Sequence, residues 1–130
     1  MSDKANGDVV LIVEDNDKNM KLARDILQFH GFTTVEATTG EDGVALTREK
    51  RPTIVLMDIQ LPGIDGVTAL ERIRQEPSTA RIPVVAMTAS VMKEDRERFD
   101  KAGFDGFITK PIDVRAFPAQ VRDAIARGRP

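Results

Sequence analysis

The sequence contains no cysteine, tryptophan or tyrosine, and it contains a single histidine, His30. Without cysteine the chain can form neither a disulfide nor a thiolate site, which fits a reducing compartment, and we expect it to be cytoplasmic. It also lacks a long apolar run, so the sequence predicts no signal peptide and no membrane insertion. His30 precedes Gly31 at an expected helix end, so we interpret it as structural and not as a phosphoryl donor.

An excess of basic charge is absent as well. The chain has 19 Lys and Arg residues against 21 Asp and Glu residues, a net charge of -2, and its basic residues do not form a cluster. We therefore expect no direct nucleic-acid binding, which depends on a basic face. The length of 130 residues and the 41% hydrophobic content predict one domain with one core. We expect a disordered tail over residues 1–8, a single domain over 9–127, and no output domain after it.

Strand-like and helix-like segments alternate along the whole chain. Short apolar or β-branched runs bounded by turn residues predict five strands. These are Val9–Val13, Phe32–Ala37, Ile54–Met57, Pro83–Met87 and Asp105–Thr109. A complete alternation with short connections predicts an α/β fold, a (βα)5 doubly wound, five-stranded parallel sheet in the order 2-1-3-4-5, as in flavodoxin-like proteins. The second strand, which is less apolar than the first and third, is expected at an edge.

The third strand carries the residue that we take as reactive. The run Ile54–Met57 ends directly on Asp58, and Pro62 and Gly63 then supply turn chemistry. Asp58 is therefore presented at the carboxyl edge of a central strand. Ligands bind at this edge in open α/β sheets.

Polar side chains also follow the other buried strands. Glu14 and Asp15 follow the first strand, Thr88 ends the fourth, and Lys110 follows the fifth. In a parallel sheet these ends converge, and strands one and three are neighbours, so both acids should lie beside Asp58. Three like charges repel one another, and Mg²⁺, which prefers a few carboxylate oxygens together with water and phosphate oxygens, would relieve that repulsion. A metal, a lysine and a hydroxyl around a carboxylate predict a site where Asp58 becomes phosphorylated.

Four motifs in order make the prediction more specific. The stretches Val13–Asn16, Met57–Gly63, Met87–Ala89 and Thr109–Pro111 resemble the motif set of bacterial response-regulator receiver domains, in particular stand-alone members of that family. The resemblance covers essentially residues 9–127. It implies a phosphoacceptor signalling protein of two-component systems rather than an enzyme, with self-catalysed phosphotransfer and autodephosphorylation at most. Its implied partners are sensor histidine kinases and, in a relay, a histidine phosphotransfer protein.

The resemblance also implies a role for each site residue. Asp58 matches the phosphoacceptor, Asp15 a direct Mg²⁺ ligand, and Glu14 a neighbouring acid that acts through water. The remaining matches are Gln60, whose backbone carbonyl is a metal ligand; Thr88 and Phe107, the switch residues; and Lys110, the phosphate-pairing lysine, with a cis bond to Pro111.

Several alternatives remain open at this point. A receiver without an output domain could act as a binding module controlled by phosphorylation, as a relay intermediate, or as a piece of a hybrid kinase. An Mg²⁺-dependent phosphatase of the haloacid-dehalogenase type would also use an aspartate nucleophile, but it needs a second aspartate where Gln60 stands. An FMN binder of the same fold would need a phosphate-binding loop, and the acidic run 14–17 would repel phosphate there.

Two local features lead to further predictions. The expected helix Met92–Ala102 has few apolar anchors, mainly Met92 and Phe99, so we predict that it shifts on phosphorylation. Pro118 lies inside the last expected helix, which begins at Asp113 and runs to about Arg127. Because an interior proline removes a hydrogen bond and clashes with a carbonyl, we predict an irregular or separate first turn over Asp113–Phe117.

Overall fold

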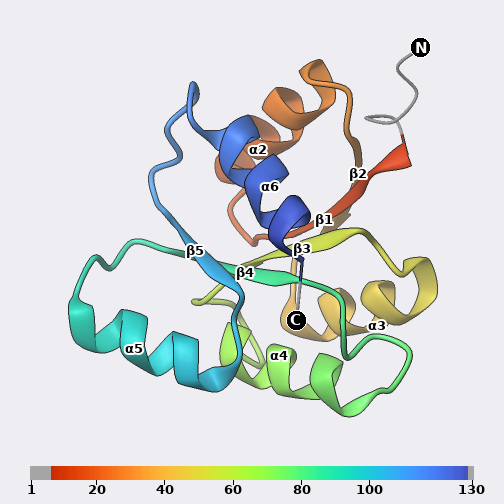
Figure 1. Cartoon of the computed structure of the whole chain (residues 1–130), viewed down its shortest axis with the longest axis vertical. Helices are drawn as coiled ribbons and strands as arrows, with labels where there is room; N and C mark the ends of the chain where they lie inside the picture. Colours follow the sequence, from red (N-terminus) through yellow and green to blue (C-terminus); the bar gives the residue numbers. More distant parts are fainter. Residues whose placement is uncertain (1–6, 129–130) are drawn as a thin grey trace.

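The protein is a three-layer α/β sandwich around one parallel sheet (Figure 1). The computed structural model describes residues 7–128, so most of the expected tail lies outside the described residues. The strand order is β2-β1-β3-β4-β5, and all four neighbouring pairs are parallel. The strands are β1 (Val9–Val13), β2 (Thr33–Ala37), β3 (Ile54–Asp58), β4 (Val84–Thr88) and β5 (Gly106–Thr109). The predicted fold class and the edge position of the second strand are confirmed.

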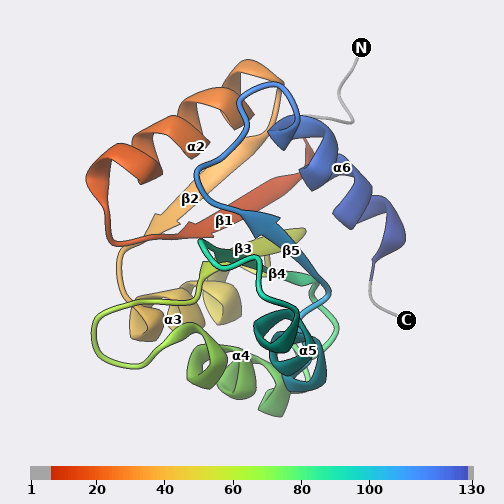
Figure 2. The same ribbon diagram turned by 90° about the vertical axis from the view of Figure 1, so that its left-hand side faces the viewer.

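Helices cover both faces of the sheet. They are α2 (Asp17–Phe29), α3 (Gly40–Lys50), α4 (Gly66–Gln75), α5 (Lys93–Ala102) and α6 (Phe117–Arg127). The two views agree that α2 and α6 lie on one face and that α3, α4 and α5 lie on the other (Figures 1 and 2). None of the helices within residues 7–128 has the length and apolar character that crossing a bilayer requires.

The three central strands have side chains that are buried on both faces. Along β1, Val10 and Ile12 pack with α2 and α6, whereas Leu11 and Val13 pack with α3 and α4. This two-sided burial explains why these strands are continuous apolar runs instead of alternating ones. The consequence for the site is that residues at the carboxyl ends of β1 and β3 stand on a closely packed support.

Side-chain caps set the beginning of three helices. Asn16 Oδ1 accepts a hydrogen bond from the Asn19 amide at 3.0 Å, and this bond starts α2. Thr39 caps α3 and Asp65 caps α4 by equivalent bonds. The residue before α5, Met92, makes no such bond. The helix α5 therefore lacks the local stabilisation that a capping side chain contributes, typically about 1 kcal/mol.

The start of the last helix differs from the simplest expectation. The α6 helix begins at Phe117, not at Asp113, and Pro118 occupies its first turn. The preceding residues form a separate turn, in which Asp113 Oδ1 accepts hydrogen bonds from the amides of Arg115 and Ala116 at 3.0 and 3.3 Å. Proline is tolerated in a first turn, where its missing N–H has no helical partner. The predicted separate turn is thus confirmed.

Two further expectations concern single positions. His30 is the C-cap of α2, and its Nδ1 lies 3.5 Å from Nη2 of Arg122, so it takes part in local structure at a helix end, as predicted. The bond between Lys110 and Pro111 is cis, also as predicted.

Candidate functional site

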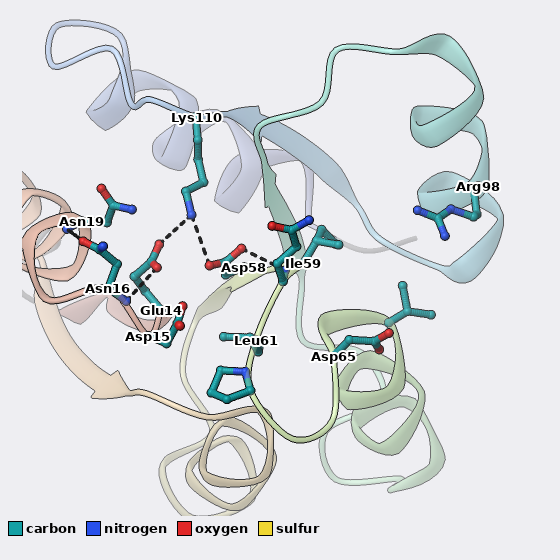
Figure 3. A pocket seen from close by; sticks show the side chains of 13 residues that line it. Glu14, Asp15, Asn16, Asn19, Asp58, Ile59, Leu61, Asp65, Arg98 and Lys110 are labelled. Carbon is teal, nitrogen blue, oxygen red and sulfur yellow. Dashed lines mark hydrogen bonds and ion pairs between the residues drawn. The ribbon is translucent and has the colours of Figure 1, made fainter.

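The carboxyl edge of the sheet forms a cavity with an acidic floor. Its volume is about 730 Å³, and Glu14, Asp15, Asp58 and Lys110 line it. One carboxylate oxygen from each of the three acids lies within 4.8 Å of the others. The side chains converge from two neighbouring strand ends and from the loop after β5 (Figure 3). The structure therefore brings together the acids and the lysine that the sequence predicts to meet.

Glu14 and Asp58 are fixed by their positions at strand ends. Glu14 follows β1 and its amide continues the sheet by donating to the Ala37 carbonyl at 3.0 Å, while Asp58 is the last residue of β3. Both are buried, with 2% and 5% exposure, whereas Asp15 is exposed. Backbone amides hold the two buried carboxylates: that of Asn16 donates to Glu14 Oε2, and that of Gln60 donates to Asp58 Oδ1, each at 3.1 Å. These bonds orient the two carboxylates and partly offset the loss of solvent.

Lys110 joins the two buried carboxylates. Its Nζ donates to Glu14 Oε1 at 3.0 Å and to Asp58 Oδ2 at 3.2 Å. Burial of the ammonium group by itself lowers the pKa of Lys110 and is the largest single effect. The hydrogen bond to Glu14, together with the charges of Asp58 and Glu14, outweighs burial, so the pKa of Lys110 is raised above its ordinary value. Lys110 is therefore a permanent cation at neutral pH, placed directly against Asp58.

The three acids fit a hard divalent cation. They offer oxygen ligands only, from carboxylates that lie close together, and this is the donor set that Mg²⁺ takes in proteins. Asp15, which also lines the cavity, is exposed, and the volume of about 730 Å³ leaves room for the waters that Mg²⁺ retains. Gln60 lines the same cavity.

Thr88 faces a second, smaller cavity that also reaches Asp58. This cavity has a volume of about 350 Å³, and Lys110 and Ser90 line it as well. Thr88 is buried, with 6% exposure, and its Oγ1 accepts a hydrogen bond from the Ser90 amide at 3.0 Å. The hydroxyl proton of Thr88 is therefore not used in that bond. Thr88 and Asp58 line the same smaller cavity.

Phe107, the sixth side chain singled out from the sequence, lies in β5 among residues of the α5 layer. Its ring centroid is 6.3 Å from that of Phe99, and the guanidinium carbon of Arg96 lies 5.9 Å from the Phe107 ring centroid. Phe107 is half-buried between the sheet and α5. Phe107 therefore packs against a side chain of α5.

Sequence reasoning missed the side chains that come from helices. Asn19 of α2, Asp65 at the start of α4 and Arg98 of α5 all line the larger cavity. Asn19 and Asp65 lie close to the four motifs in sequence and could have been found by extending them. Arg98 follows Thr88 by a loop and more than one helical turn, and only the direction of α5 brings it to the cavity.

The sequence as a whole matches a known family. The model of the response regulator receiver domain matches residues 10–122. The chain is similar to the polar-differentiation response regulator DivK of Brucella anthropi, with 43% identity over 108 residues, which are 83% of this chain and 88% of the relative. DivK of Brucella ovis is 42% identical over the same length.

Solved structures agree with the sequence relatives. A response regulator structure from Chloroflexus aurantiacus superimposes with a TM-score of 0.87 and 28% identity, covering 92% of this chain and 98% of that one. The receiver domain of the sensor histidine kinase PA1611 from Pseudomonas aeruginosa has a TM-score of 0.85 and 29% identity over the same shares of the two chains. That structure holds a magnesium ion coordinated in its active-site cleft. The match over most of the sequence, together with the acidic edge of a 2-1-3-4-5 sheet, shows that this chain belongs to the response regulator receiver domain family.

Proposed function

We propose that Asp58 accepts a phosphoryl group from a sensor histidine kinase and that the phosphorylated chain then signals through protein contacts. One observation carries the proposal: Asp58 is a buried carboxylate in contact with Lys110, and its oxygens lie among those of Glu14 and Asp15. Receiver domains as a family take phosphoryl groups from histidine kinases, and this chain is one of them.

The step is an in-line displacement at phosphorus. A carboxylate oxygen of Asp58 forms the new P–O bond, the P–N bond to the donor imidazole breaks, and its electron pair stays on that nitrogen. Glu14, Asp15 and Asp58, with the backbone carbonyl of Gln60, would hold Mg²⁺, which supplies positive charge to the transferring phosphoryl oxygens. Lys110, which contacts Asp58, offsets the negative charge of another phosphoryl oxygen. The packed strands hold the carboxylate of Asp58 in place.

Thr88 and Phe107 would transmit the phosphorylation of Asp58 to α5. The hydroxyl of Thr88 still has its proton to donate, and we propose that it donates to a phosphoryl oxygen on Asp58. When Thr88 moves toward that oxygen, the loop between β4 and α5 changes its position. Phe107 packs against Phe99 of α5, so its contacts change with the helix. Because Phe107 has no hydroxyl, its response is a change of packing and not a new hydrogen bond.

The similarity to DivK favours a binding module controlled by phosphorylation over other downstream roles. A relay role, in which Asp58 passes the phosphoryl group to a histidine phosphotransfer protein, is the second candidate. The two are separated by mixing the labelled chain with purified histidine phosphotransfer proteins. Transfer of label within seconds to one of them would support the relay.

The central experiment uses acetyl phosphate as the donor, with and without Mg²⁺. We expect the wild-type chain to gain one phosphoryl group only when Mg²⁺ is present, and Asp58→Asn to gain none. A matched control is Asp123→Asn, because Asp123 is an exposed carboxylate of α6 that is not among the residues lining either cavity. Phos-tag electrophoresis and intact-mass spectrometry measure the product. Label on Asp58→Asn, or on another residue of the wild type, would refute the proposal.

A further inference from the structure

We propose that Arg98 binds the phosphodonor: its guanidinium attracts the incoming phosphoryl group and pairs with it on the side of the cavity opposite Lys110. The inference rests on the proposed role of Asp58 and adds a residue that the family motifs do not contain.

The position of Arg98 makes such a contact possible. Arg98 and Asp58 both line the larger cavity and the smaller one. It extends from α5 toward the pocket, across from Lys110 (Figure 3). A phosphoryl group on Asp58 that occupied either cavity would share it with both cations. An approaching donor would therefore meet a cation on either side.

The charges around the larger cavity explain why a cation at position 98 would favour the approach of an anionic donor. Among the described residues that line it, the acids are Glu14, Asp15, Asp58 and Asp65, and the cations are Lys110 and Arg98. Lys110 is already bonded to two carboxylates. With Mg²⁺ bound, the four acids, the metal ion and Lys110 together still leave one net negative charge at the cavity, and Arg98 is the remaining lining residue that can offset it as an anionic donor approaches. In a partly enclosed cleft such a charge acts over several ångströms.

The contacts of the Arg98 side chain are weak enough to be replaced by contacts with a phosphodonor. Its Nη2 lies 3.6 Å from Asp95 Oδ1, beyond hydrogen-bond range, and its guanidinium carbon lies 4.8 Å from the Phe99 ring centroid. The Arg98 side chain is 65% exposed. The other oxygen of Asp95 accepts a short hydrogen bond, 2.6 Å, from Ser90 Oγ. Asp95 is thus held by the loop after β4 and keeps Arg98 near the cavity without binding it firmly.

The chemistry of arginine suits the proposed ligand. A planar guanidinium forms two parallel N–H···O bonds with phosphate oxygens, which gives both charge and geometry. With acetyl phosphate as donor, Arg98 would bind phosphoryl oxygens that do not react. Asp58 forms the new P–O bond, the bond between phosphorus and the acetyl oxygen breaks, and acetate leaves with the electron pair. Arg98 takes no proton and no electrons in this step.

The test compares Arg98→Gln with Lys101→Gln. Both changes remove one positive charge from α5, but Lys101 is exposed and is not among the residues lining the two cavities. Rates of phosphorylation by acetyl phosphate are measured with saturating Mg²⁺ at low and at high ionic strength. We expect Arg98→Gln to be slower than wild type by about fivefold at low salt, with the difference shrinking at high salt, and Lys101→Gln to stay within about 1.5-fold. Arg98→Lys should recover part of the rate, because lysine keeps the positive charge but cannot form the two parallel hydrogen bonds of a guanidinium.

Binding measurements separate a direct contact from damage to the helix or to the metal site. Beryllofluoride with Mg²⁺ mimics the phosphoryl group on an aspartate, and titration calorimetry measures its affinity. We expect about a fivefold loss for Arg98→Gln, with the affinity for Mg²⁺ alone unchanged. Equal rates, salt dependence and beryllofluoride affinity for the two glutamine variants would overturn the inference, as would an equal loss of Mg²⁺ affinity in Arg98→Gln. If the wild type itself takes no phosphoryl group on Asp58, the proposed function fails; if only the Arg98 result is negative, that function stands.

Discussion

The two sides of the larger cavity are built differently. On one side, Glu14 and Asp58 stand at the ends of β1 and β3, whose residues are almost entirely buried. On the other side, α5 contributes one buried side chain, Phe99, and begins without a side-chain cap. Its first turn is tied to the preceding loop by the hydrogen bond from Ser90 to Asp95. The first side is held by apolar packing and the second largely by polar contacts near the surface.

This difference suggests a division of work. A group that performs chemistry must be held within a fraction of an ångström, and closely packed strands achieve that. An element that reports the chemistry must be able to move, so it comes from the less stable part of the structure. The following predictions test whether this contrast is real, from the largest expected effect to the smallest.

Truncation of a strand side chain should have the largest effect. Leu56 in β3 has no exposed surface, and we expect Leu56→Ala to lower the free energy of unfolding by about 3 kcal/mol through lost packing and a cavity. Met92, at the start of α5, is 57% exposed, and Met92→Ala should change that free energy by less than about 0.5 kcal/mol. Urea denaturation of both variants measures the difference. Similar losses of unfolding free energy in the two variants would show that the strand side and the α5 side are equally well packed.

Hydrogen exchange tests the contrast without substitution. We expect amides of Leu11–Val13 to exchange only through global unfolding, and amides within Lys93–Ala102 to exchange through local opening. The α5 amides should exchange faster by about 100-fold or more, equivalent to roughly 2.7 kcal/mol or more. Equal protection of the two segments would show that α5 is held as firmly as the sheet, and would contradict its predicted shift on phosphorylation.

Loss of the Ser90 hydroxyl should affect only the α5 side. Ser90→Ala removes the hydrogen bonds from Ser90 Oγ to Asp95 and from the Met92 amide to Ser90 Oγ. We expect exchange within α5 to become faster by an amount equivalent to about 1 kcal/mol, and exchange within β1 to stay unchanged. Ser78→Ala, at an exposed serine outside this loop, is the control. Faster exchange in β1 as well would mean that the two sides are coupled.

The smallest effect concerns the pH dependence of the strand side. Because the pKa of Lys110 is raised in the folded state, its ion pairs stabilise the fold fully below the unfolded pKa of about 10.5. That stabilisation is lost as the pH rises through the higher folded pKa. NMR titration of the Lys110 side chain should therefore give a midpoint above 10.5, and Asp58→Asn should lower it. A wild-type midpoint below 10.5 would show that burial outweighs the two carboxylates.

Local chemistry was sufficient to predict most of the fold and the acids of the site. Apolar runs that end on polar residues identify the strands, and the carboxyl ends of parallel strands meet at one edge, so Asp58, Glu14 and Lys110 could be placed together in advance. Pro118 was likewise enough to predict the separate turn before α6, because the constraint on its backbone is local. The first residue of α6 does not follow from Pro118 alone, since it also depends on the hydrogen bonds that Asp113 accepts.

What the amino-acid order alone determined is thus the set of elements, their layering and the chemistry at the strand ends, because each follows from short-range periodicity and from the geometry of a parallel sheet. The tertiary structure decided which helix side chains reach the cavity. Arg98 belongs to a helix whose direction depends on how Phe99 packs against Phe104 and Phe107, and on the bond from Ser90 to Asp95. Such contacts join residues from different elements, and no sequence spacing specifies the angle at which a helix crosses a sheet.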